Sequence, residues 1–221
     1  MNPTDYSYEY AKIYKFITQH KNYKDEVTSL KNFLISKSFN INSTLLSVGC
    51  GICLHENRLA EEGYKLIATD NSKAMLNLAQ KESNKNISFF SSLKEIPKKC
   101  DSTFAISLFN VVNCLDNIQE LISFFKEINN SLLLGAGFFF ESWNLYPCIL
   151  EPPKNVEREF GNKNSQNFLI RKAFPKFDVL NQKLIIKYLI IGKFNDEEIN
   201  LTSKHRLKIF SINEIEYALQ E

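Results

Sequence analysis

Two glycines and an acid are the residues of this chain whose types and spacing point most directly to chemistry. Gly49 and Gly51 flank Cys50 in a short turn, and Asp70 follows about 20 residues later. Glycines let a backbone approach a ligand closely, and N–H groups at the start of a following helix point at it. A carboxylate at this distance accepts hydrogen bonds from a ribose diol. These residues predict a nucleoside site; plain turn glycines with Asp70 as a surface helix cap are the alternative.

Buried strands and a helix must hold these residues in place, and the surrounding sequence has the required pattern. An apolar run at 44–48 leads into the turn, residues 54–62 have helical character, and a second apolar run at 65–69 precedes Asp70. The alternation continues with strands expected at 87–90, 103–109 and 138–141 and helices at 72–82 and 117–133. This regularity predicts an α/β fold, a Rossmann-like doubly wound sheet with helices on both faces.

The two ends of the chain depart from that alternation. Residues 5–36 repeat apolar positions at helical spacing and predict helices that cover the site. After an irregular proline-containing segment, residues 168–174 and 183–193 read as strands without a helix between them, which predicts an antiparallel cap inserted after the fifth strand. We expect one domain over 1–221, made of lid helices (1–40), a nucleoside-binding core (43–143), a cap insertion (144–210) and a last helix (211–221) that Ser211 and Glu214 start as a capping box.

Composition limits the classes of partner. The chain has 221 residues, of which 44% are hydrophobic and 24% charged, and its net charge of +2 argues against nucleic acid or an anionic membrane as the main partner. It shows neither a signal peptide nor an apolar run long enough for a membrane helix, so we expect a cytoplasmic protein. Its five cysteines, including Cys50, Cys53 and Cys100, read as reduced thiols; no second CxxC or nearby histidine completes a metal site.

With these segments in this order, the chain resembles a class I S-adenosylmethionine-dependent methyltransferase. The sequence Val-Gly-Cys-Gly resembles the first motif of that family, Asp70 its ribose-binding acid, residues 101–116 its fourth strand and residues 135–143 its fifth. The resemblance implies S-adenosyl-L-methionine as cofactor. We expect the cofactor to be bound by Tyr14, Gly49, Cys50, Gly51, Asp70, Asn71, Met75, Ser92, Leu93 and Phe109. The tyrosine-rich helices would cover the sulfonium, whose charge suits an aromatic face, although such tyrosines are also typical of an ordinary amphipathic helix.

Two further resemblances narrow the subgroup. The opening tyrosines resemble the N-terminal helices that cover the cofactor in small-molecule methyltransferases. The stretch from Trp143 through the prolines to Arg158, with the segment that begins at His205, resembles enzymes that methylate sugars, often nucleotide-linked, and related small metabolites. The resemblance implies a small-molecule acceptor. We expect neither nucleic acid nor a membrane as partner, and we leave open whether the protein forms a homodimer. We expect the acceptor to meet Asn110, Glu141, Trp143 and Arg158, with Arg158 and Arg171 pairing with a phosphate and His205 acting as a base. Solvated surface arginines and a solvent-exposed histidine are the alternatives.

Several positions depart from the family pattern. Ser47 stands where the first motif usually begins with an acid, Cys53 replaces its third glycine, and Ser91-Ser92-Leu93 stands where an acid usually holds the adenine amino group. No sequence remains for the two closing strands of the sheet, so either the chain is truncated or the sheet has five parallel strands. A degenerate protein of this fold that acts through a partner is therefore a second hypothesis. An NAD-dependent oxidoreductase is the third, although Leu54 occupies a position where its motif needs glycine.

Overall fold

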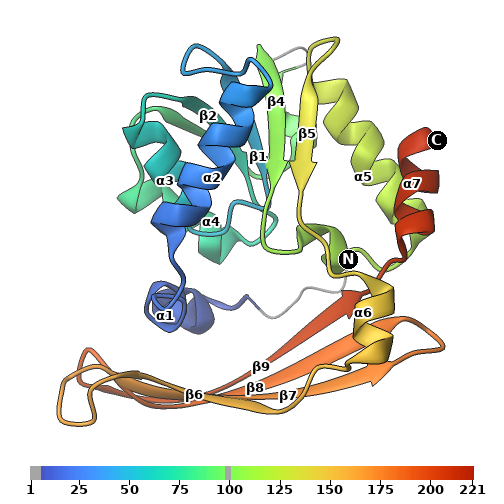
Figure 1. Ribbon diagram of the computed structural model, residues 1–221. Coiled ribbons are helices and arrows are strands. Elements are labelled where there is room, and N and C mark those ends of the chain that lie inside the picture. Colours follow the sequence, from blue (N-terminus) through green and yellow to red (C-terminus); the bar gives the residue numbers. More distant parts are fainter. Residues whose placement is uncertain (1–5, 98–100) are drawn as a thin grey trace.

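A computed structural model describes residues 6–97 and 101–221, which form a Rossmann-like core above an antiparallel cap (Figure 1). The core sheet is parallel throughout, with the order β3-β2-β1-β4-β5. Its strands are β1 (Thr44–Val48), β2 (Lys65–Thr69), β3 (Ile87–Phe90), β4 (Ser102–Ser107) and β5 (Gly137–Phe140). The predicted fold class is confirmed. Two strands end earlier than predicted: β4 ends at Ser107, so Phe109 lies in the turn beyond it, and β5 ends at Phe140, before Glu141.

Helices cover both faces of this sheet because successive strand residues point to opposite sides. Leu45 packs in a cluster with residues of α2 (Tyr23–Ser36), α3 (Leu54–Glu61) and α4 (Lys73–Glu82). Its neighbour Leu46 packs on the other side with Ile128 of α5 (Ile118–Ser131) and, further out, the short 3₁₀ helix η1 (Leu93–Glu95). The last helix, α7 (Ile212–Gln220), packs on α5 and begins with the predicted capping box of Ser211.

The cap is a four-stranded antiparallel sheet with the order β6-β7-β8-β9. Its strands are β6 (Val156–Gly161), β7 (Phe168–Asp178), β8 (Lys183–Phe194) and β9 (Glu197–Lys208), preceded by α6 (Leu145–Leu150). The sequence predicted only the two apolar strands, β7 and β8. The outer strands β6 and β9 were missed because they are rich in charged residues and mostly exposed, so they lack an apolar run.

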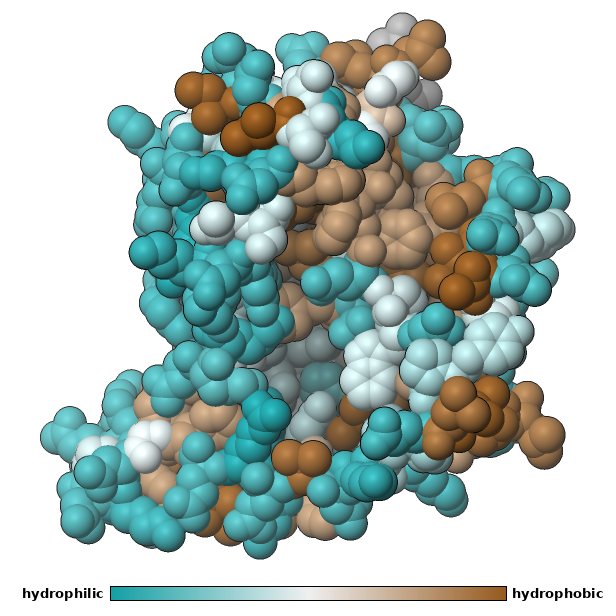
Figure 2. All heavy atoms as spheres, in the orientation of Figure 1, coloured by the Kyte–Doolittle hydropathy of each residue, from teal (hydrophilic) through white to brown (hydrophobic). Residues whose placement is uncertain are grey.

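Helix α1 (Tyr8–Ile17) lies between the core and the cap (Figure 1). Its buried residues Tyr10, Ile13 and Ile17 pack against Phe160 and Leu169 of the cap. The space-filling view shows the molecule hollowed between core and cap, and apolar side chains gather beside α2 (Figure 2). None of the helices within the described ranges is long and apolar enough to cross a membrane.

Candidate functional site

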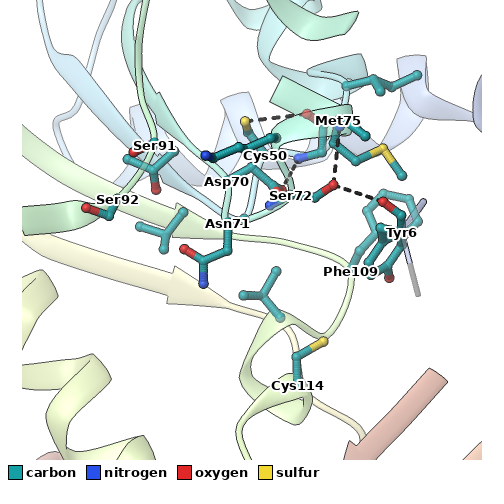
Figure 3. A pocket seen from close by; sticks show the side chains of 18 of the residues that line it. Tyr6, Cys50, Asp70, Asn71, Ser72, Met75, Ser91, Ser92, Phe109 and Cys114 are labelled. Carbon is teal, nitrogen blue, oxygen red and sulfur yellow. Dashed lines mark hydrogen bonds between the residues drawn. The ribbon is translucent and has the colours of Figure 1, made fainter. Parts of the chain in front are cut away.

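A cavity of about 1230 Å³ opens at the carboxyl ends of β1, β2 and β4, where ligands bind in open parallel sheets. Every residue expected from the sequence to bind the cofactor lines it: Tyr14, Gly49, Cys50, Gly51, Asp70, Asn71, Met75, Ser92, Leu93 and Phe109. Several of them surround the space shown in Figure 3. The fold thus brings together side chains from the lid helix, the glycine turn and the ends of β2, β3 and β4.

The glycine turn is held against β2 and has a backbone that favours glycine. Gly49 has φ +76° and Gly51 φ +57°, and the N–H groups of Gly49 and Cys50 both donate to the carbonyl of Thr69. A Cβ on Gly49 would lie 2.4 Å from Cγ2 of Val111, so this glycine also permits close approach of the β4 loop. The turn therefore needs glycine at position 49 for two separate reasons.

Asp70 is tied to the turn from the end of β2 (Figure 3). Its Oδ2 accepts a hydrogen bond from the Gly51 N–H at 2.7 Å and its Oδ1 one from the Ser72 N–H at 2.8 Å. Burial raises the pKa of the Asp70 carboxyl, and these two N–H donors oppose that rise. Each carboxylate oxygen keeps a further lone pair, so the group can still accept from a ribose diol.

The third strand ends in a hydroxyl that is held in place by a carboxylate. Ser91 donates its hydroxyl to Oε1 of Glu95 at 2.5 Å and its backbone N–H to Oε2 at 3.0 Å. These bonds lower the pKa of Glu95 and leave the Ser91 oxygen only its lone pairs to offer. Ser91 lines the cavity, so its hydroxyl oxygen presents an acceptor at the place where the family usually has an acid. Glu95 was not predicted as a site residue, although its place in the turn after Ser91 was the available signal.

Tyrosines and Phe109 form the wall of the cavity at the other side of Asp70. Burial raises the pKa of Tyr6 and of Tyr14 well above the ordinary value, so both are neutral phenols at physiological pH. Phe109 has φ +60° and Asn110 φ +59°, two consecutive left-handed residues other than glycine. Such strain persists only where the surroundings fix it, and it is concentrated at functional sites.

Glu141 and Lys21 hold this strained turn. The carboxylate of Glu141 accepts the N–H of Phe109 at 2.7 Å, and the Lys21 ammonium lies 3.1 Å from the centroid of the Phe109 ring. Asn113, buried in the same loop, accepts from the Trp143 N–H at 2.8 Å and donates to the carbonyl of Lys208. The loop after β4 is thereby joined to the segment after β5 and to the end of β9.

The four residues expected to bind the acceptor do not line this cavity. Asn110 and Glu141 belong to the strained turn and its support, Trp143 is bonded through its backbone to Asn113, and Arg158 lies on β6 of the cap. The structure therefore does not gather them into one acceptor site. Their roles in binding the acceptor stay predictions.

His205 lies in β9 with 7% of its surface exposed, so the alternative of a solvent-exposed histidine is wrong. Its ring packs against those of Tyr6, Tyr10 and Tyr188, and its Nε2 lies 2.9 Å from Oγ of Ser203. Burial, aided by the charge of Arg171, lowers the pKa of His205 to about 4. The imidazole is therefore neutral near pH 7 and stands behind the cavity wall. Its role as a base stays a prediction.

Stability should depend on His205 at acid pH. Because the folded state disfavours the protonated ring, the unfolding free energy decreases as the pH falls from 6.5 towards about 4, and this loss is complete below about 4. The difference in pKa corresponds to a loss of about 3 kcal/mol of unfolding free energy. Urea unfolding between pH 7 and pH 4 should show a shallower decline for His205→Gln than for the parent. Equal declines would contradict this environment for the ring.

His55 is the histidine that lines the cavity, although the resemblance pointed to His205 as the base. Its Nε2 lies 2.8 Å from Oε2 of Glu26, and its ring packs on Tyr23 and Phe109. A carboxylate bonded to an imidazole fixes the orientation of the ring. The pairing joins residues 29 positions apart in the chain, which no local motif announces.

The cysteines in the described chain are free thiols at positions 50, 53, 114 and 148, while Cys100 lies outside the described residues. Across residues 6–97 and 101–221, histidines, cysteines and acids form no group of three or more that would hold a metal ion. Burial raises the pKa of Cys114, on the cavity wall, to about 11, so this thiol is protonated and unreactive as a nucleophile.

The fold matches that of class I S-adenosylmethionine-dependent methyltransferases. Residues 46–140, from β1 to β5, match the family model described as a methyltransferase domain. These residues therefore carry a methyltransferase domain, which supports an enzyme that uses S-adenosylmethionine as cofactor. This result decides against the oxidoreductase alternative. The sequence matches none of the curated proteins.

Solved structures share the fold over nearly the whole chain. A methyltransferase from Clostridium acetobutylicum is 15% identical, with a TM-score of 0.76 over 96% of this chain and 85% of that one. The sugar N-methyltransferase KedS8 from a Streptoalloteichus species is 13% identical, with a TM-score of 0.80 over 96% and 82%. The amino pentose methyltransferase CalS10 from Micromonospora echinaspora is 16% identical, with a TM-score of 0.73 over 99% and 89%.

Proposed function

We propose that this protein transfers a methyl group to the amine of a small polar acceptor, a sugar or nucleotide sugar. The observation that carries the proposal is the joint placement of the glycine turn, Asp70 and Ser91 along one cavity. S-adenosylmethionine would supply a methyl group already activated on a sulfonium. The protein then mainly has to align the acceptor, which suits a site built from aromatic and backbone groups. An amine that binds in its neutral form needs less help from a base than a hydroxyl does.

One similar structure is named as a sugar N-methyltransferase and another as an amino pentose methyltransferase, which supports this choice of acceptor. The positive charges of the cap support an anionic group on the acceptor. Arg158 and Arg171 lie directly opposite each other on β6 and β7, and within the described residues neither has a carboxylate at ion-pair distance. Like charges in that position are destabilising unless an anion joins them.

The two faces of the cap differ in a way that favours this anion. Glu157, next to Arg158 in β6, is opposite Lys172 of β7 and bonded to it at 2.9 Å. The charge of this carboxylate is therefore neutralised on the other face of the cap. The Arg171 guanidinium lies 5.3 Å from the Phe160 ring centroid, on the face turned toward α1. Both arginines help lower the pKa of His20, after its burial, which places His20 near them. The unneutralised positive charge thus faces the α1 side.

Direct assays test the proposal. S-adenosylhomocysteine should bind in isothermal titration, and at about 100 times its Kd it should add about 2.7 kcal/mol to the unfolding free energy. Incubation with S-adenosylmethionine and a panel of free and nucleotide-linked amino sugars should yield a methylated product by mass spectrometry. Binding of neither nucleoside would favour the degenerate alternative, and methylation of hydroxyl sugars only would overturn the choice of an amine.

The cap arginines give a separate prediction. Arg171→Gln should weaken the binding of uridine diphosphate and of inorganic pyrophosphate, measured with S-adenosylhomocysteine present, by about tenfold or more, because charge-assisted hydrogen bonds are lost. Lys172→Gln is the matched control, since it removes the same charge from the opposite face next to Arg171. Equal losses in both variants would indicate only a general effect of net charge.

A further inference from the structure

A buried hydrogen bond joins the two ends of the glycine turn. Ser47, two residues before Gly49 in β1, donates its hydroxyl to Oε1 of Glu56 in the first turn of α3 at 2.6 Å. Ser47 is 2% exposed and Glu56 3% exposed. The bond spans the whole turn, because Ser47 precedes it and Glu56 follows it.

This carboxylate stands in an environment that ordinarily excludes one. Burial raises the pKa of Glu56, which the charge of His55 and the Ser47 hydroxyl oppose. Its second oxygen, Oε2, is buried and has no hydrogen-bond partner within the described residues. A buried acid with one unsatisfied oxygen reduces stability relative to an apolar side chain. Stability therefore does not explain why Glu56 carries a carboxylate at this position.

The turn between Ser47 and Glu56 is the part of the fold that most needs to be fixed. Gly49, Gly51 and Cys53 all have positive φ, and Cys53 at +60° is not a glycine. Cys53 also begins α3 without a side-chain hydrogen bond to the helix. A backbone of this kind keeps its shape only when its neighbours restrain it at both ends.

We propose that Glu56, acting through Ser47, is a positioning residue that holds the glycine turn in the shape that binds S-adenosylmethionine. The inference rests on the proposed use of that cofactor at this turn. It also gives Ser47 a purpose: the strand offers a hydroxyl, and the carboxylate comes from the facing helix. Although Ser47 replaces the acid that usually begins the first motif, Glu56 still supplies a carboxylate beside the start of the turn.

A reciprocal exchange tests this inference. Glu56→Ser should raise the Kd of S-adenosylhomocysteine by about tenfold in isothermal titration. The double variant Ser47→Glu/Glu56→Ser restores a hydroxyl–carboxylate pair of the same combined length and should return the Kd to within about threefold of the parent. Glu61→Ser, a change at an exposed site of the same helix, is the control and should leave the Kd unchanged.

Each result decides the matter. If Glu56→Ser binds as tightly as the parent, or if the exchange does not recover affinity, the positioning role is wrong and Glu56 serves only to start the helix. A thermal midpoint measured without ligand identifies that outcome, since helix capping would lower the midpoint and leave the Kd alone. Glu56→Gln, which keeps shape and an acceptor oxygen, replaces the serine variant if the latter does not fold. Failure of the parent itself to bind S-adenosylhomocysteine would overturn the proposed function instead.

Discussion

Asp70→Ala should raise the Kd of S-adenosylhomocysteine by roughly 100-fold. The carboxylate is bonded to the Gly51 and Ser72 N–H groups and has lone pairs left for a ribose diol. Hydrogen bonds to a charged group contribute about 1.5–3 kcal/mol each, so the loss of two at the lower limit, about 3 kcal/mol, corresponds to about this change. The variant also leaves the Gly51 N–H without its acceptor, which loosens the turn that faces the ligand.

Isothermal titration of parent and variant measures this effect. Asp70→Asn should lie between them, because the amide keeps one acceptor oxygen at nearly the same place. Asp178→Ala is the control: Asp178 lies at the end of β7 in the cap, bonded only locally to Asn181, and its loss should not change the Kd. A Kd for Asp70→Ala within about threefold of the parent would remove the ribose contact from the site.

The sequence predicted those parts of the site that depend on local pattern. Gly49, Gly51 and Asp70 follow from the order strand, turn, helix, strand, since parallel strands carry their loops to one edge of the sheet. The apolar strands β7 and β8 of the cap were equally visible. In each case the signal lies within a few consecutive residues.

The supports of the site could not be predicted in that way. Glu56 faces Ser47, Glu26 faces His55, and Glu141 accepts from Phe109, each across a gap of 9 to 32 residues. These pairings depend on how α2, α3 and β5 are arranged around the cavity. The sequence assigned Glu141 to the acceptor because it follows a strand, yet its carboxylate is bonded to the backbone of Phe109.

The same distinction explains His205. Its segment resembles sugar-modifying enzymes and suggested a base, but strand β9, which its charged residues concealed in the sequence, places the ring against Tyr6 and Tyr10. A neutral imidazole there contributes to the contact between the lid helix and the cap. The histidine that reaches the cavity is the one bonded to Glu26, which identifies His55 as the first residue to examine if the acceptor must lose a proton.

Gly49→Ala should lower the unfolding free energy by roughly 2–5 kcal/mol. The left-handed backbone of position 49 costs about 1–2 kcal/mol for a residue with a Cβ. The new methyl group would also lie 2.4 Å from Cγ2 and 2.8 Å from Cγ1 of Val111, and overpacking of this kind costs about 1–3 kcal/mol. Urea unfolding of parent and variant measures the sum.

Two further variants separate these contributions. Gly135→Ala has a similar φ, +80°, with nothing within 4 Å of the new Cβ, so it should show the backbone cost alone. The double variant Gly49→Ala/Val111→Ala removes the clash. Adding Gly49→Ala to Val111→Ala should therefore lower the unfolding free energy by less than adding it to the parent does. Because Val111 also lines the cavity, the single variant should displace it and weaken the binding of S-adenosylhomocysteine, and the double variant should regain part of that affinity. If the losses of unfolding free energy from the two single changes simply added in the double variant, the close approach of Val111 would not be what excludes a Cβ at position 49. Strain in the backbone would then be the sole reason for glycine there.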